Sequence, residues 1–209
     1  MPCREEETSV FWIETDQELA DAVASWENCV GLDTEFIRTD TFYPIPGLYQ
    51  VASADQVFLI DPLTIEDWQP FSTFLMDPKT LIVMHACQED LEMLNHHLKV
   101  QPTSVVDTQF AHALTGVDYS LSYANLVRRT IGVELHKQET RSNWLQRPLS
   151  EEQLTYAADD VIYLVPMYQA LRERMLGGGR LSWFDEDMSI RGRYEEPDPG
   201  AYHAQVHRA

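Results

Sequence analysis

The chain has 209 residues, of which 44% are hydrophobic and 11% aromatic, a composition that fits one globular domain with a buried core and excludes a disordered chain. Fifteen Lys and Arg residues against 34 Asp and Glu residues give a formal net charge of −19. Such acidity argues against extended, non-specific binding of nucleic acid, but it does not exclude a small site where metal ions meet a phosphate.

The sequence also bears on where the protein works. No apolar run approaches the ~18 residues that span a bilayer, and the acidic segment 1–7 lacks the apolar core of a secretion signal. The cysteines Cys3, Cys29 and Cys87 are odd in number and widely spaced, which favours reduced thiols over a disulfide framework or a zinc site. We therefore expect a cytoplasmic protein without membrane association or a disulfide-linked partner.

Hydrophobic periodicity predicts antiparallel strands first and then an alternation of strands and helices. We expect strands at residues 11–13, 30–36, 48–52, 56–60, 81–84 and 105–106. We expect helices at residues 17–27, 65–75, 87–98, 108–114, 121–130 and 150–174, and loops at 38–46 and 136–143. The first strand should lie at an edge, and the next three should form an antiparallel meander. The fold class is therefore α/β, a mixed sheet of antiparallel and parallel strands flanked by helices.

The composition changes after three consecutive glycines at 177–179. The stretch that follows is acidic and poor in core residues, with two prolines and a glycine between 197 and 200. We interpret 177–209 as a partly ordered acidic extension or linker.

Two carboxylates lie two residues apart in the apolar strand predicted at 30–36. Residues i and i+2 of a strand point to the same face, so Asp33 and Glu35 should emerge side by side. Two adjacent anions on a core strand repel each other and are costly to bury unpaired, and this strand contains no Lys or Arg. A bound divalent metal ion is one interpretation, and a solvated strand end is the other.

Two further acids lie on predicted helices. Asp90 belongs to the first turns of the helix at 87–98, where the helix dipole alone gives a reason for an acid. Tyr156 and Asp160 are four residues apart, so their side chains meet on one helix face. The helical angle directs Asp160 inward and Asp159 toward solvent. The pair of Tyr156 and Asp160 either positions a water molecule or stabilises the core by a hydrogen bond.

Together these motifs resemble the DEDDy exonucleases, which are named for four acids and a tyrosine, and more closely the catalytic domain of bacterial ribonuclease D. The five motif positions occur in order as Asp33-x-Glu35, Asp90 and Tyr156-x-x-x-Asp160. The segments that resemble this catalytic domain are 32–36, 43–44, 47–48, 59–63, 85–94, 107–109, 137–144, 147–149 and 156–164. The resemblance covers roughly residues 10–175.

The resemblance implies a ribonuclease H-like fold and a 3′-5′ exonuclease domain at 1–176. It implies hydrolysis of RNA from a single-stranded 3′ end with release of nucleoside 5′-monophosphates, in the maturation or trimming of tRNA precursors and other structured RNAs. Ribonuclease D proteins carry helical domains after the catalytic domain, so we expect 177–209 to lead toward such a domain and the chain to be either a natural short form or an excised catalytic domain.

The resemblance also implies a two-metal-ion mechanism with Mg²⁺ or Mn²⁺, hard ions that prefer oxygen ligands. The implied metal ligands are four carboxylates, Asp33, Glu35, Asp90 and Asp160. By the same analogy Asp33 bridges both ions, and Tyr156 orients the attacking water.

Five other residues are candidates for substrate binding: Phe36, Tyr43, Lys137, Arg141 and Trp144. The two cations suit phosphate and Trp144 suits base stacking, but two surface cations and a buried Trp anchoring the loop are equally consistent with the sequence. Phe36 and Tyr43 either flank the 3′-terminal nucleotide or belong to the core.

Three polar residues outside the motifs have simpler explanations. We expect His85 to be a hydrogen-bonded structural residue, and we expect Asp61 and Asp107, each at a strand end, to stabilise a turn or cap a helix.

Two other functions are consistent with the sequence. The first is a DNA exonuclease, because no residue that reads the ribose 2′-OH can be identified. The second is a catalytically silent scaffold that binds RNA or protein. All five motif residues are intact, which counts against the scaffold.

Overall fold

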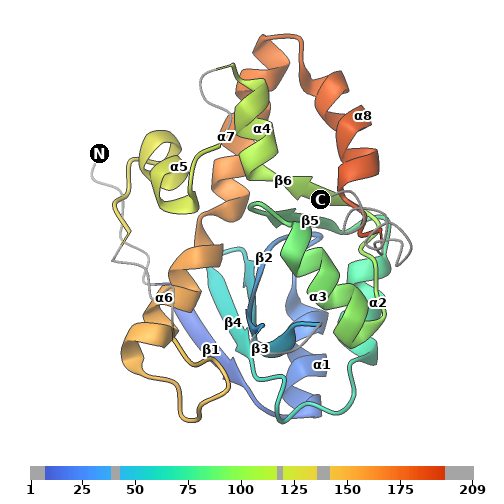
Figure 1. Ribbon diagram of the computed structural model, residues 1–209, viewed down its shortest axis with the longest axis vertical. Helices are drawn as coiled ribbons and strands as arrows, with labels where there is room; N and C mark the ends of the chain where they lie inside the picture. Colours follow the sequence, from blue (N-terminus) through green and yellow to red (C-terminus); the bar gives the residue numbers. More distant parts are fainter. Residues whose placement is uncertain (1–7, 39–42, 117–119, 136–141, 196–209) are drawn as a thin grey trace, which may run out of the picture.

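The computed structural model describes residues 8–38, 43–116, 120–135 and 142–195. Six strands form one sheet in the order β1-β4-β3-β2-β5-β6 (Figure 1). The strands are β1 Ser9–Ile13, β2 Cys29–Ile37, β3 Ile45–Ser53, β4 Gln56–Ile60, β5 Leu81–Met84 and β6 Val105–Asp107. The helices are α1 Asp16–Ser25, α2 Gln69–Met76, α3 Gln88–Leu98, α4 Thr108–Leu114, α5 Tyr123–Thr130, α6 Glu151–Ile162, α7 Leu164–Gly177 and α8 Leu181–Arg191.

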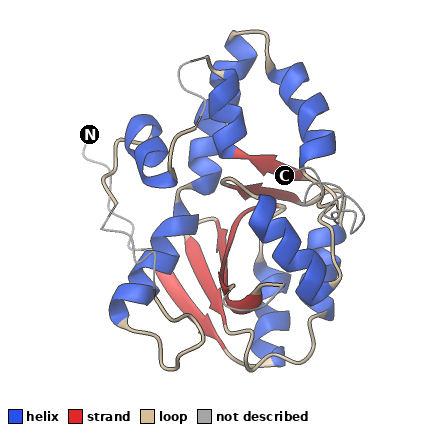
Figure 2. Ribbon diagram, viewed as in Figure 1, coloured by secondary structure: helices blue, strands red, loops and turns tan. Residues whose placement is uncertain are grey.

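The sheet combines both kinds of strand pairing. β2 pairs with β3 and β3 pairs with β4 in antiparallel register, which confirms the predicted meander. β1 runs parallel to β4 at one edge, and β2, β5 and β6 are parallel neighbours toward the other edge. With helices packed against the strands (Figure 2), the predicted mixed α/β fold is confirmed.

Alternation along β2 assigns its side chains to the two faces of the sheet. Thr34 faces α3, because its hydroxyl donates a hydrogen bond to Asp90 in that helix. Gly31 faces the other way, where an added Cβ atom would come within 2.7 Å of the carbonyl oxygen of Val161. Asp33, two residues after Gly31, therefore faces α6 and α7.

The largest aromatic cluster lies on the face of the sheet that carries Thr34. Trp26, which ends α1, packs against Phe58 of β4 with ring centroids 5.6 Å apart. It also packs against Phe71 and Phe74 of α2 at 5.7 and 5.1 Å. Helices α1 and α2 are thus fixed to the sheet by apolar burial, which stabilises by about 25 cal/mol per Å² of buried surface.

Two predicted boundaries were misplaced. The predicted loop at 38–46 ends earlier, because β3 begins at Ile45. The helix predicted from residue 65 begins at Gln69, with Pro70 in its first turn. Proline is tolerated there because the N–H groups of a first turn have no partner within the helix.

The single helix predicted at 150–174 is wrong, because the chain forms two helices there. α6 ends at Ile162 and α7 begins at Leu164. Pro166 has no N–H to donate to the carbonyl of Ile162, and its ring clashes with that carbonyl in a continuous helix. The break changes the direction of the chain just after Asp160.

The predicted C-terminal extension contains a helix that the sequence analysis missed. Phe184 and Met188 of α8 are buried in the core, and Phe184 stacks on Phe110 of α4 at 5.9 Å. The acidic residues between these anchors obscured the apolar face. None of the helices in the described ranges is both long and apolar enough to cross a membrane.

Candidate active site

β2 is longer than its parallel neighbour β5, and this difference opens the site. β5 pairs with β2 only from Cys29 to Gly31, after which the chain turns into α3. Asp33 and Glu35 therefore lie on a part of β2 that pairs with β3 alone. A register shift between Glu35 and Phe36 ends the regular ladder just beyond the two acids.

The turn that leads from β5 into α3 is held by Asp107. Ala86 in this turn has a φ angle of 55°, in the left-handed region that residues with a Cβ seldom adopt. The Asp107 carboxylate accepts hydrogen bonds from the backbone N–H groups of Ala86 and Cys87, at 3.0 and 3.2 Å. It also caps α4 through the N–H of Gln109, so its predicted capping role is confirmed.

Asp90 reaches β2 through Thr34. Asp90 lies in the first turn of α3 and is buried, and the Thr34 hydroxyl donates to its carboxylate at 2.6 Å. Thr34 lies between Asp33 and Glu35 in the sequence. The hydrogen bond thus ties the second motif to the first across 56 residues of chain.

Tyr156 and Asp160 are brought to the acids of β2 by α6. The helix begins with the predicted capping box, in which Ser150 and Gln153 exchange hydrogen bonds. The Tyr156 hydroxyl and the Asp160 carboxylate are hydrogen-bonded to each other, as the spacing of four residues allows. Gly31 lets the end of α6 approach β2 closely, because a larger residue would collide with it.

The end of α6 is also held from α5. The Tyr123 hydroxyl donates a hydrogen bond to the backbone carbonyl of Asp159 at 2.9 Å. Asp159 is partly exposed and lines an open surface pocket. Asp160, the next residue, points inward as predicted and meets the acids of β2.

Three carboxylates meet at the centre of the site. Asp33, Glu35 and Asp160 each offer an oxygen atom, and these atoms lie within 4.8 Å of one another. Asp90 is outside this set of three, but its charge acts on both acids of β2 and raises their pKa values. The five motif residues therefore converge from β2, α3 and α6.

Burial and mutual repulsion make these acids hard to ionise. Burial, and then the charges of Asp160 and Asp90, raise the pKa of Glu35 to about 8. Burial raises the pKa values of Asp90 and Asp160 to about 7. The hydrogen bond from Thr34 to Asp90 and that from Tyr156 to Asp160 favour the charged forms and oppose this rise. The pKa of Asp33 is raised well above its usual value by burial and by the other three acids.

A divalent cation fits this donor set. The site offers oxygen ligands, which hard ions such as Mg²⁺ and Mn²⁺ prefer. Among the described residues, no Lys or Arg forms an ion pair with any of the four acids. Asp33, Glu35 and Asp160 are therefore the residues that could hold a metal ion, with Asp90 beside them.

A loop packed against Tyr156 forms one wall of the site. Trp144 in this loop is buried, and its ring lies 6.0 Å from that of Tyr156. Gly47 of β3 makes room for the loop, because an added Cβ atom would come within 2.6 Å of the Trp144 Cβ. The burial of Trp144 supports its interpretation as an anchor of the loop.

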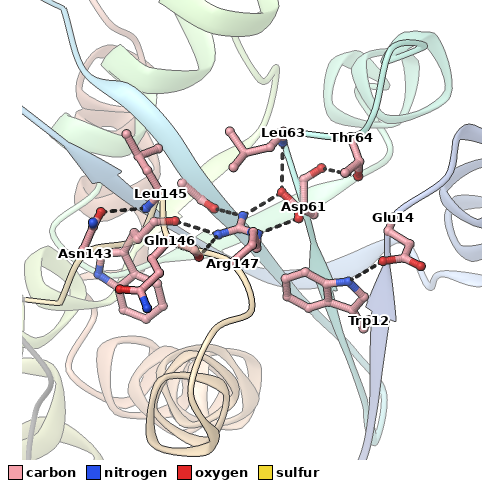
Figure 3. A network of polar contacts seen from close by, with 11 residues as sticks. Trp12, Glu14, Asp61, Leu63, Thr64, Asn143, Leu145, Gln146 and Arg147 are labelled. Carbon is pink, nitrogen blue, oxygen red and sulfur yellow. Dashed lines mark hydrogen bonds and ion pairs between the residues drawn. The ribbon is translucent and has the colours of Figure 1, made fainter.

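Arg147 fastens the same loop to the sheet (Figure 3). Its guanidinium donates to both carboxylate oxygens of Asp61 at 2.6 Å, and also to the carbonyl oxygens of Trp144 and Gly47 at 2.8 Å. Asp61 additionally accepts from the N–H of Leu63, which confirms its predicted turn role. The ion pair with Arg147 was not predicted, because 86 residues separate the partners.

The residues predicted to bind substrate differ in where the structure places them. Lys137 and Arg141 lie outside the described residues. Phe36 is half-buried, with the guanidinium of Arg38 6.0 Å from its ring centroid. Tyr43 is 42% exposed and packs against His96 with ring centroids 3.8 Å apart and the rings tilted by 34°. The substrate role of all four stays a prediction.

His85 is a structural residue, as expected. Its Nδ1 and Nε2 atoms are hydrogen-bonded to the Thr108 hydroxyl at 2.9 Å and to the Leu121 carbonyl at 3.1 Å. Burial lowers the pKa of His85, so the neutral imidazole is favoured.

Several positioning residues escaped the sequence analysis. Gly31 carried a readable signal, because a glycine inside an apolar strand often marks a close backbone approach. The sequence gives no comparable signal for Thr34 and Arg147, because each binds a common residue type that is distant in sequence.

The chain is similar to known exonucleases in sequence. A family model described as 3′-5′ exonuclease matches residues 10–176. Ribonuclease D of Pseudomonas paraeruginosa is 43% identical over 201 residues, which are 94% of this chain and 53% of that protein. Ribonuclease D of Shewanella sp. is 37% identical over 210 residues, 98% of this chain and 54% of that protein. The chain thus spans about half the length of these curated relatives.

Solved structures agree with this assignment. Escherichia coli RNase D, described as an exoribonuclease involved in structured RNA processing, matches with a TM-score of 0.85 and 36% identity over 94% of this chain and 54% of that chain. The Nibbler EXO domain of Aedes aegypti matches with a TM-score of 0.75 over 88% of this chain and 99% of that chain. At 22% identity, the second likeness shows a shared fold alone.

Proposed function

This chain belongs to the 3′-5′ exonuclease family, and on that premise we propose that it hydrolyses RNA from the 3′ end with metal ions held by its acid cluster. The observation that carries the proposal is the meeting of Asp33, Glu35 and Asp160 within 4.8 Å. These acids stay costly to ionise until a cation offsets them, so the site is built for a ligand of high positive charge.

The carboxylates have the role of holding and spacing the cations. Asp33, Glu35 and Asp160 would hold the cations near the attacking water, and Asp90 beside them would help to hold a cation near the leaving group. Bound Mg²⁺ or Mn²⁺ supplies the positive charge that a scissile phosphate needs and lowers the pKa of the attacking water. Thr34 holds the Asp90 carboxylate at 2.6 Å, which limits its rotation toward solvent.

Tyr156 has the role of orienting the attacking water. Burial and the Asp160 charge raise the pKa of Tyr156, so its phenol stays protonated at neutral pH. The hydroxyl donates a hydrogen bond to Asp160, keeps its proton, and has lone pairs that can accept a hydrogen bond from water. Tyr156 thus positions the water and does not act as a base, and Trp144 packed against its ring holds it in place.

The products we propose are nucleoside 5′-monophosphates, released one at a time from a single-stranded 3′ end. The names of the relatives support RNA as the substrate. Precursors of tRNA and other structured RNAs are the substrates we favour, in the cytoplasm. The free thiols of Cys29 and Cys87 suit that reducing compartment.

The decisive experiment uses a single-stranded RNA labelled at its 5′ end, with Mg²⁺ or Mn²⁺. We expect a ladder that shortens from the 3′ end, and we expect EDTA or the substitution Asp33→Ala to abolish it. A matched DNA strand, if shortened faster than the RNA, would replace the RNA proposal by the DNA exonuclease. Intact RNA at micromolar protein would favour the silent scaffold.

A further inference from the structure

Gln50 is an unusual residue in the middle of β3. Its side chain is fully buried, and neither its amide nitrogen nor its amide oxygen has a hydrogen-bond partner among the described residues. Buried polar side chains in folded proteins are nearly always paired, so an unpaired primary amide needs an explanation.

Two other buried polar side chains of the sheet have partners, because the Thr34 hydroxyl donates to Asp90 and the Ser53 hydroxyl accepts from the N–H of Glu27. Away from the acids, the buried Nε1 of Trp26 also has no hydrogen-bond partner among the described residues, but Gln50 leaves both of its polar atoms unpaired next to Asp33 in the register. An apolar side chain of the same size would fill the space of Gln50 without unpaired atoms.

The position of Gln50 links it to the acid cluster. It lies directly opposite Asp33 in the antiparallel register of β2 and β3, and opposite Leu59 on its other side. Side chains opposite each other in a sheet share one face, with Cβ atoms about 4.5–5.5 Å apart. Gln50 thus lies on the face that carries Asp33, on the side of α6, at a separation that a glutamine side chain can span.

A carboxylate shared between two cations benefits from such a donor. Each ionised carboxyl group has about four lone-pair sites, of which metal ions occupy some. Donors behind a ligand fix its orientation and strengthen its binding, and their loss typically weakens metal affinity by about 10–100-fold. Arg and Lys would serve less well here, since a buried cation would compete with the metal ions.

We propose that Gln50 is a positioning residue of the metal site, whose amide nitrogen donates a hydrogen bond to the Asp33 carboxylate when cations are bound. This inference rests on the proposed function, because it assigns a supporting residue to the same site. In the cation-free protein both polar atoms of the amide lie unpaired, and cation binding would give the amide nitrogen a partner.

The test is the substitution Gln50→Met, which keeps the length and approximate volume of the side chain and removes both polar atoms. We expect the Mn²⁺ dissociation constant, measured by calorimetry, to rise at least about tenfold. We expect the melting temperature in EDTA to be equal to or above that of the native chain, because an unpaired amide has been removed. Gln50→Leu repeats the test if the Met variant does not fold.

Leu59→Met is the matched control, because Leu59 lies beside Gln50 on the same face and does not neighbour Asp33 in the register. It should leave Mn²⁺ affinity unchanged. Unchanged affinity in the Gln50 variants would overturn the inference, as would an equal loss in Leu59→Met. In both cases the native chain still binds Mn²⁺ and the proposed function stands. A native chain that binds no Mn²⁺ would overturn both.

Discussion

The protein contains two acidic sites that are built in opposite ways. At Asp61, the guanidinium of Arg147 donates to both carboxylate oxygens, and a backbone N–H also donates. At Asp33, the charged groups that most raise its pKa are three more acids, and no Lys or Arg of the described chain forms an ion pair with it. The Asp61 site has its cation within the protein, whereas the Asp33 site is compatible with a bound metal ion.

The difference indicates that the Asp61 site is structural and that the Asp33 site is functional. A buried charge is tolerated when it is paired and hydrogen-bonded, and the Asp61–Arg147 pair meets that condition while fastening the loop that carries Trp144. The acids around Asp33 repel one another in the cation-free fold, and in the function we propose a metal ion offsets that repulsion. Removing a charged group should therefore raise the free energy of unfolding at the Asp33 site and lower it at the Asp61 site.

Glu35→Gln should give the largest effect. We expect activity to fall about 10³-fold or more, which corresponds to about 4 kcal/mol in the barrier, because one metal ligand loses its charge. The free energy of unfolding in EDTA at pH 8 should rise by about 1–2 kcal/mol, since a buried repulsive charge is removed. Urea titration and a nuclease assay measure the two quantities.

The control for that variant is Glu173→Gln, which makes the same change of charge at an exposed position of α7. It should alter neither quantity measurably. A Glu35→Gln protein that is less stable than the native chain in EDTA would show that the acids of β2 are not mutually repulsive.

Arg147→Met should act on stability in the opposite direction. It leaves Asp61 buried without its cation, so we expect the free energy of unfolding to fall by about 3 kcal/mol. The double substitution Arg147→Met with Asp61→Leu should recover a large part of that loss, because the unpaired charge is gone. A double variant as unstable as the single one would mean that the ion pair itself does not cause the loss.

The stability of the cation-free protein should also depend on pH. In the folded chain the pKa values are about 8 for Glu35 and about 7 for Asp90 and Asp160, above the ordinary values of 4.5 and 3.8. The folded state therefore binds more protons than the unfolded state, and stability falls as pH rises from the ordinary pKa values to the raised ones. We expect a loss of about 5 kcal/mol between pH 6 and 8 in EDTA.

Saturating Mn²⁺ should reduce that loss, because metal ions bind the deprotonated carboxylates. Denaturation at several pH values, with EDTA and with Mn²⁺, measures both curves. Stability in EDTA that stays level or rises between pH 6 and 8 would contradict the raised pKa values.

Tyr156→Phe should give the smallest effect. We expect turnover to fall about tenfold, or about 1.4 kcal/mol, because the attacking water loses an oriented partner. Mn²⁺ affinity should change little, since the phenol is not a ligand in this account. A collapse of Mn²⁺ affinity in calorimetry would instead make Tyr156 a part of the metal site.

Local patterns predicted the meander, the edge strand and the capping box at Ser150 because these features depend on neighbours in sequence. The five motif residues were found through a resemblance in their order, and spacing alone left other interpretations open for each. The break before α7 also had a local signal in Pro166, which outweighs the helical periodicity on either side of it.

Contacts between distant parts of the chain could not be predicted. The Thr34–Asp90 and Asp61–Arg147 pairs join residues 56 and 86 positions apart, and only the folded arrangement selects them among many possible partners. The burial of Phe184 in α8 was hidden for a related reason, because a helix with two apolar anchors among acids resembles a linker until its packing surface is known.

Diffraction from a crystal of this chain soaked in Mn²⁺ tests the central claim most directly. Anomalous scattering should give a peak at coordination distance from the carboxylate oxygens of Asp33, Glu35 and Asp160, and a second peak nearer Asp90. A saturating soak that leaves this position without a peak, while the carboxylates keep their present arrangement, would contradict the account.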